Sequence, residues 1–190
     1  MKVKNPASVD VEKELKREQY KAKYRKTLVS TLFALITASA VAVLIATLWL
    51  LVLQIFGSSM SPTLEEGQIV VSLKIDEMTT GDVIAFYYGN KVLVKRYIAG
   101  PGSWVNIRED GTVEVDGEVL DEPYLQEKSL GICDLEMPYQ VPDESFFVMG
   151  DYRETSIDSR HSSVGCVSVD DIVGKIVYRV WPLSELGAVN

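Results

Sequence analysis

The sequence contains little histidine and little cysteine, which narrows the chemistry that it can perform. Its 190 residues include one histidine, His161, and two cysteines, Cys133 and Cys166. The cysteines form no CxxC pair, and no Cys/His spacing typical of a metal site is present. We therefore expect no metal and no other cofactor. A disulfide is permitted in an oxidising compartment but is not required, because only geometry decides whether two cysteines can be joined.

The scarcity of histidine also limits the choice of catalytic base. A Ser-His-Asp triad would have to use His161, and a Cys-His protease would need Cys133 or Cys166 beside it. His161 lies in the polar segment "DSRHSSVG", which is typical of a surface loop. Cys166 lies between Gly165 and Val167, which is typical of a small residue in a turn or a strand. These two alternatives stay open, but the sequence around them does not favour either.

Charge is absent from one long stretch and unevenly distributed around it. Residues 1–26 carry nine Lys/Arg and four Asp/Glu, residues 27–64 carry no charge, and residues 65–190 have a net charge of −13. An acidic domain repels phosphates, so we expect no nucleic-acid partner. The basic head lies directly before the uncharged stretch, which is where positive charge marks the cytoplasmic side of a membrane span.

The uncharged stretch predicts a membrane-spanning helix. Residues 28–56 read "LVSTLFALITASAVAVLIATLWLLVLQIF", and about 20 apolar residues suffice to cross a bilayer. A cleaved signal sequence is the alternative, because Ala38-Ser39-Ala40 resembles a cleavage site. Cleavage there would leave an apolar N-terminus in need of burial. We therefore predict a basic cytoplasmic tail at 1–26, a transmembrane helix at 27–56 and an extracytoplasmic domain at 57–190.

The extracytoplasmic part predicts a mainly β fold built of antiparallel sheets, Greek-key or barrel-like in form. Short β-branched and aromatic segments such as "QIVVSLKI", "DVIAFYYG" and "IVGKIVYRVWP" alternate with Gly, Asp and Asn. Glu109-Asp110-Gly111 and Val115-Asp116-Gly117 are hairpin signals. Residues 103–143 are acidic and rich in turns, which indicates an inserted subregion.

One lysine has surroundings that could make it a base. Lys95 lies within the apolar segment "KVLVKRYIAG", and in a strand it shares a face with Leu93 and Tyr97. Burial disfavours an ammonium ion and lowers its pKa. A shift of two to three units would bring a lysine from about 10.4 into the range useful at neutral pH. An exposed strand lysine is the alternative.

Four segments in order resemble the signature boxes of type I signal peptidases, the membrane-bound Ser/Lys proteases that release exported proteins. They read "GSSMSPTLEEGQIV", "TTGDVIAFYYG", "VLVKRYIAGPG" and "FFVMGDYRETSIDSRHSSVG". With the preceding span and the closing "IVGKIVYRVWP", the resemblance covers residues 28–182. The short length and the single span are similar to the compact Gram-positive enzymes.

The resemblance implies a catalytic dyad and a set of supporting residues. Ser59 in "SMSPT" matches the nucleophile, Lys95 matches the general base, and Met60 is implied to contact substrate. Ser156 is expected to orient the lysine amine. The residues expected to shape the site around them are Arg96, Asp151, Asp158 and Arg160. No metal is implied.

The chain departs from the family pattern at a few positions. The family box Gly-Asp-Asn-Arg-Asp-Asn-Ser reads "GDYRETS" here, so Tyr152, Glu154 and Thr155 differ. We interpret this as an altered loop surface and not as lost chemistry. Gly57 replaces a serine that helps to bind the oxyanion in some relatives, which leaves the second oxyanion donor open.

The implied function is the removal of N-terminal signal peptides from exported preproteins after small residues, by a serine endopeptidase anchored in the lipid bilayer. Ser59 is three residues past Phe56, at most about 10 Å along the chain, so we expect it near the outer membrane surface. We expect residues 69–73 and the "DVIAFYYG" segment to line the substrate pockets. Self-cleaving repressors with a Ser/Lys dyad and an inactive membrane-tethered binding module are the alternatives.

Overall fold

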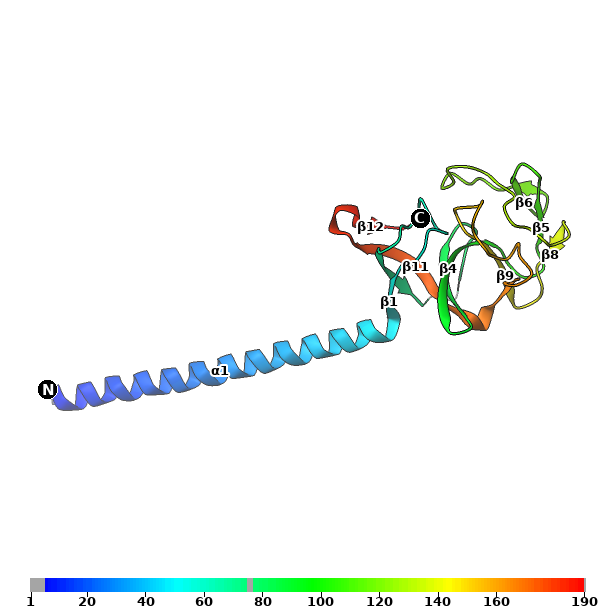
Figure 1. Ribbon diagram of the computed structural model, residues 1–190. Helices are drawn as coiled ribbons and strands as arrows, with labels where there is room; N and C mark the ends of the chain where they lie inside the picture. Colours follow the sequence, from blue (N-terminus) through cyan, green and yellow to red (C-terminus); the bar gives the residue numbers. More distant parts are fainter. Residues whose placement is uncertain (1–5, 75–76, 190) are drawn as a thin grey trace. The chain divides into compact units, whose positions relative to one another are not determined.

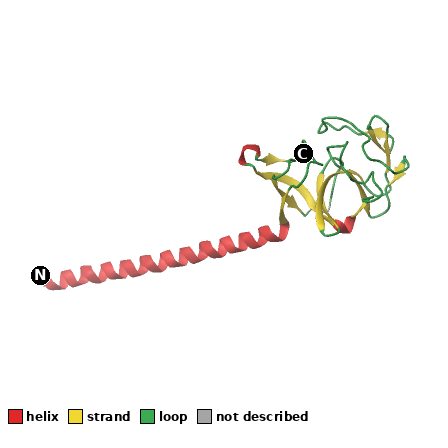
Figure 2. Ribbon diagram, in the orientation of Figure 1, coloured by secondary structure: helices red, strands yellow, loops and turns green. Residues whose placement is uncertain are grey.

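The computed structural model describes residues 6–74 and 77–189, and contacts within the chain divide it into two units at residues 48 and 49. The first unit is a helix, and the second is a mainly β domain (Figures 1 and 2). Each unit is described here by itself.

Helix α1 runs from Pro6 to Trp49. Its segment Glu14–Leu44 contains an 18-residue stretch with a mean hydropathy of 2.1, which is long and apolar enough to cross a membrane. The sequence predicts that the helix continues to Phe56, whereas the structure ends it at Trp49 and places strand β1 at Leu50–Gln54. The apolar composition of "LLVLQ" suits a strand as well as a helix, and pairing with a distant strand decides between the two.

The larger sheet of the β domain is antiparallel throughout, which confirms the predicted fold class. Its strand order is β1-β2-β11-β3-β4-β9-β10, and β12 pairs with β11. The remaining strands of this sheet are β2 (Ile69–Leu73), β3 (Val83–Tyr88), β4 (Lys91–Ala99), β9 (Ser145–Met149), β10 (Val167–Ser168), β11 (Ile172–Trp181) and β12 (Gly187–Ala188). Two short 3-10 helices, η1 (Val169–Asp171) and η2 (Leu183–Glu185), flank β11.

A smaller antiparallel sheet lies between β4 and β9 in the sequence. Its order is β7-β6-β5-β8, formed by β5 (Trp104–Ile107), β6 (Val113–Val115), β7 (Glu118–Val119) and β8 (Tyr139–Gln140). Both sequence signals for hairpins lie at its turns. Asp116 and Gly117 have φ values of 54° and 84° between β6 and β7, as a two-residue hairpin turn requires.

The hydrophobic core of the domain consists of three clusters of buried side chains. One contains Met60, Leu64 and Val70, another contains Ile98, Val105 and Phe147, and the third contains Ile84, Phe86 and Val148. Strand β4 contributes to all three, because Val92 and Val94 pack against the first, Ile98 belongs to the second and Leu93 packs against the third. The central position of β4 is what holds Lys95 inside the domain.

Candidate active site

The segment after β1 presents Ser59 at the surface of the domain. Gly57 has a φ of +79°, a conformation that L side chains rarely adopt, and it turns the chain out of the strand. The neighbouring Met60 is 2% exposed and Leu64 is fully buried. These two side chains anchor the turn in the core, so that Ser59, which is half-buried, is held in a fixed place.

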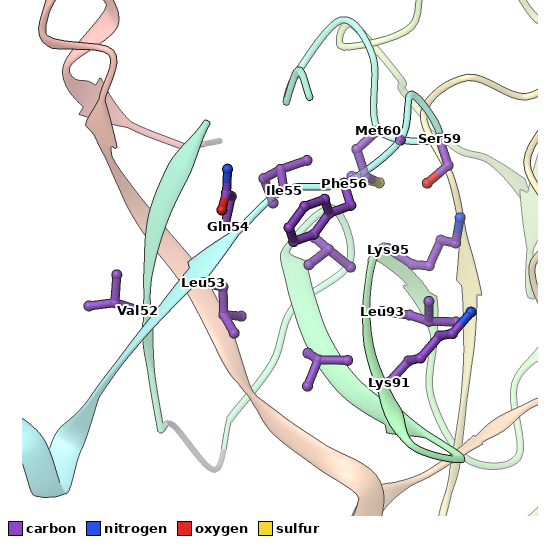
Figure 3. Close-up of a pocket in the computed structure, with 13 residues that line it drawn as sticks. Val52, Leu53, Gln54, Ile55, Phe56, Ser59, Met60, Lys91, Leu93 and Lys95 are labelled. Atoms are coloured by element: carbon purple, nitrogen blue, oxygen red, sulfur yellow. The ribbon is translucent and has the colours of Figure 1, made fainter. Parts of the chain in front are cut away.

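Lys95 lies next to Ser59 although the two are far apart in the sequence. Both residues line the same cleft, and Figure 3 shows the Ser59 hydroxyl and the Lys95 amine pointing toward one another. Lys95 is 4% exposed. Its Nζ donates a hydrogen bond of 2.9 Å to Ser156 Oγ. The structure thus brings together three residues of the predicted site.

Burial lowers the pKa of Lys95 from 10.5 to about 8. The carboxylates of Asp158 and Asp151 act in the opposite direction, and the positive charge of Arg160 adds to the lowering. Desolvation is the dominant cause, because removing an ammonium ion from water favours its neutral form. At neutral pH a useful fraction of this lysine carries a lone pair.

Ser156 connects Lys95 to a buried ion pair. Asp158 accepts hydrogen bonds from Arg160 Nε and Nη2, both of 2.9 Å, and from the Gly150 N–H, also of 2.9 Å. Burial would raise the pKa of Asp158, but hydrogen bonds from Arg160, Gly150 and Ser156 hold it below the usual value. Asp158 therefore stays ionised and can accept the hydroxyl proton of Ser156, which leaves the oxygen of Ser156 to accept from Lys95.

Asp151 and Arg96 form a second buried pair beside the first. Arg96 Nε and Nη2 donate to the two carboxylate oxygens of Asp151 at 2.8 and 2.6 Å. Thr63 Oγ1 also donates to Asp151, at 2.5 Å. This pair ties strand β4 to the segment after β9 and to the segment that carries Ser59, and so fixes the relative positions of the nucleophile and the base.

Gly150 is the point of closest approach in the site. A Cβ atom placed there would collide with Ser156 Oγ and with the Ser59 carbonyl oxygen. The Tyr152 N–H donates to the same carbonyl at 3.1 Å. Only glycine lets the end of β9 pack directly against the turn that carries Ser59.

Two supporting residues were not predicted from the sequence, Glu122 and Tyr124. Glu122 forms a fully buried ion pair with Arg153. The ring of Tyr124 lies 3.7 Å from the guanidinium carbon of Arg96, and its hydroxyl donates to Glu122 at 3.0 Å. Both residues belong to the segment between β7 and β8. No local pattern in the sequence marks them, since their partners lie more than twenty positions away.

The cleft in front of Ser59 has a volume of about 630 Å³. Its walls come from β1, from the segment up to Met60 and from residues Lys91–Lys95 of β4. Residues 69–73 and "DVIAFYYG", expected to line the substrate pockets, are not among the residues that line this cleft. Met60, expected to contact substrate, reaches the cleft but is packed mostly in the core.

The histidine and the cysteines lie outside this cleft. His161 Nδ1 is 2.7 Å from Ser163 Oγ, and its Nε2 is 3.8 Å from an Asp134 oxygen. Cys133 and Cys166 are free thiols, and burial raises the pKa of Cys166 to about 11. Within the described ranges, no three His, Cys, Asp or Glu side chains are grouped as metal ligands. A serine that faces a buried lysine on a β scaffold is the arrangement that a Ser/Lys hydrolase would need.

Comparison with known proteins is consistent with this class. The signal peptidase family, peptidase S26, matches residues 28–181. Signal peptidase I of Bacillus caldolyticus is 34% identical over 145 residues, which cover 68% of this chain and 78% of that protein. Signal peptidase IB of Staphylococcus aureus (strain COL) is 36% identical over 150 residues, which cover 68% and 76%. The chain therefore belongs to the signal peptidase family, and it is a peptidase.

A solved structure from the same family was also found. The crystal structure of a signal peptidase I from Enterococcus faecalis V583 is 29% identical, covers 54% of this chain and 98% of its own, and superposes with a TM-score of 0.44.

Proposed function

We propose that this peptidase removes signal peptides from exported preproteins with Ser59 as nucleophile and Lys95 as general base. The observation that carries the proposal is the shared cleft, in which a half-buried serine faces a lysine whose pKa is lowered to about 8. The Lys95 amine donates one N–H to Ser156. Its lone pair can then point to the Ser59 hydroxyl, as general-base catalysis requires.

The reaction is an acyl transfer in two halves. Neutral Lys95 takes the proton of Ser59 Oγ while the oxygen attacks the scissile carbonyl carbon. The ammonium then returns that proton to the leaving amine, and the new N-terminus departs. In the second half Lys95 takes a proton from water, the hydroxide attacks the ester, and Ser59 recovers its proton. The Ser59 N–H stabilises the oxyanion.

Substrate fits the cleft as an added strand. The Ile55 N–H donates to the Gln68 carbonyl, and the Ile55 carbonyl accepts from the Gly67 N–H. Backbone groups alternate in direction along a strand, so those of Gln54 and Phe56 point to the side away from β2. β1 stands at the end of the strand order. An extended peptide can therefore pair with this edge and place its side chains in the cleft, whose apolar walls suit small residues before the cut.

Helix α1 and the exposed apolar residues support a location at the bilayer surface. We place the basic residues 1–26 in the cytoplasm and the β domain on the outer side, following the charge asymmetry. Phe56 is 77% exposed, and Trp181 and Leu183 are exposed as well. Because β1 lies between the helix and Ser59, the chain can carry Ser59 farther from the membrane than the 10 Å that the sequence suggested.

A cleavage assay tests the proposed chemistry. Detergent-solubilised full-length chain is incubated with a preprotein that carries an Ala-x-Ala site, beside Ser59→Ala and Lys95→Ala variants. We expect cleavage by the parent chain and a loss of at least a thousandfold in each variant. Parent-like cleavage by either variant overturns the dyad. Lys74→Ala, which removes an exposed lysine outside the cleft, serves as the matched control and should cleave like the parent chain.

A further inference from the structure

A second cleft borders the turn that carries Ser59, at Ser61. It has a volume of about 580 Å³ and is lined by Ser61, residues 126–129 and residues 151–154. It shares no lining residue with the cleft of Ser59 and Lys95. The chain passes from one cleft to the other between Ser59 and Ser61, and the Tyr152 N–H holds the Ser59 carbonyl. A peptide that lies in the first cleft and extends past Ser59 can therefore reach the second.

The two clefts differ in chemistry. The first is walled mostly by apolar side chains, with Gln54, Lys91 and Lys95 among them, whereas the second is walled mostly by hydroxyl, amide and charged groups. Residues before the cut belong to the apolar signal peptide. Residues after the cut become the N-terminus of a water-soluble product. A polar cleft suits the second group.

The charges of the second cleft do not cancel. Asp151 is neutralised by Arg96, and Arg153 by Glu122. The remaining charged side chains of the cleft are exposed, and they are Glu127, Lys128 and Glu154. Glu65 adds a further carboxylate beside the wall, since it accepts the Ser61 hydroxyl at 2.7 Å. Negative charge is therefore in excess around the cleft.

We propose that this second cleft binds the first residues of the substrate after the cut, and that Glu127 and Glu154 make it prefer basic over acidic side chains there. This inference rests on the proposed function. Glu154 lies in "GDYRETS", at a position where the family box carries Asp, and Glu127 lies in the segment between β7 and β8. The altered loop surface thus acquires a role in specificity.

The test compares preproteins that are identical up to the cut. The first two residues after the cut are both alanine, both lysine or both glutamate, and kcat/KM is measured with the full-length chain. We expect the lysine substrate to exceed the glutamate substrate about fivefold or more at low ionic strength, because exposed charge pairs are worth up to about fivefold each. The ratio should fall toward one in high salt.

Variants of the chain locate the origin of the preference. Glu127→Lys combined with Glu154→Lys should invert the lysine-to-glutamate ratio. Glu118→Lys combined with Glu136→Lys makes the same change in net charge at exposed positions outside the cleft, and should leave the ratio unchanged. Thermal melting of each variant verifies that it is folded.

The outcomes separate the two proposals. Absence of cleavage for all three preproteins contradicts the proposed function. Equal cleavage of all three overturns the second cleft as a specificity site while the function stands. A preference that survives the charge reversal at Glu127 and Glu154 overturns it too.

Discussion

In the proposed mechanism Lys95 serves as a base while it is buried, so its titration should control the rate. Because only the neutral amine accepts a proton, activity should rise with pH and level off above about pH 8, the pKa of Lys95. Below that value we expect kcat/KM to fall about tenfold per pH unit. A pH-rate profile from 6 to 10 measures this, and a rate that stays constant between pH 6 and 8 contradicts it.

Burial of the Lys95 amine also lowers the stability of the fold. Its pKa is about 8 in the folded chain and 10.5 in the reference state, so the folded state binds its proton more weakly. The penalty is complete below about pH 8, shrinks as pH rises from 8 to 10.5, and is on the order of 3 kcal/mol.

Replacing Lys95 by a neutral side chain should therefore stabilise an inactive protein. We expect Lys95→Met to raise the free energy of unfolding by about 1–3 kcal/mol at pH 7, part of the gain being offset by the lost hydrogen bond to Ser156. Urea titration at pH 7 and at pH 10 checks this, because the gain should shrink at the higher pH. Lys74→Met, at an exposed position outside the cleft, should change neither stability nor activity. An unchanged or lower stability of Lys95→Met at pH 7 would show that burial of the amine is not costly.

At the scale of elements, β1 is where the sequence was hardest to interpret. The segment "LLVLQ" is as apolar as the helix before it, so composition could not separate the two. The contribution of β1 to the cleft was missed for the same reason, because this strand was counted as part of the membrane span. For Lys95, alternation within one strand left an exposed position open as the alternative, and the family resemblance favoured the buried one, where the structure places it.

The free edge of β1 gives a test of substrate binding. The Gln54 N–H points away from β2, whereas the Ile55 N–H donates to Gln68 at 2.8 Å. Gln54→Pro should lower kcat/KM about fivefold to tenfold, the worth of one hydrogen bond, while the melting temperature changes little. Ile55→Pro should destabilise the domain itself, since it removes a bond of the sheet. Parent-like kinetics of Gln54→Pro would exclude pairing of substrate with this edge.

The ion pairs of the site show what one sequence can and cannot reveal at this scale. Arg96 and Asp151 were assigned from the family boxes, and Arg153 was seen to match its box. Glu122 and Tyr124 lie in a turn-rich segment with no periodic pattern, so their contacts follow only from the three-dimensional arrangement. The same holds for Thr63, whose hydroxyl donates a hydrogen bond to Asp151.

For the whole molecule, the charge asymmetry predicts the topology. Residues 1–26 are basic and the β domain is acidic, which favours a cytoplasmic tail. Protease added outside intact spheroplasts should degrade the β domain and leave an N-terminal epitope tag protected. Protection of the β domain, with loss of the tag, would contradict the proposed orientation. Lysis before digestion is the control, and it should expose both ends.

The buried pair of Arg153 and Glu122 has a consequence for how the domain comes apart. Glu122 belongs to the segment between β7 and β8, and Arg153 follows β9. Detaching that segment would leave the buried guanidinium of Arg153 without its carboxylate partner. Leaving a buried charge without its counterion costs several kcal/mol. The contact between the ring of Tyr124 and Arg96 would be lost in the same step. A half-assembled form with an intact dyad is thus a high-energy species. The β domain should therefore unfold as one cooperative unit, and we expect the dyad to be assembled only once the segment between β7 and β8 has docked.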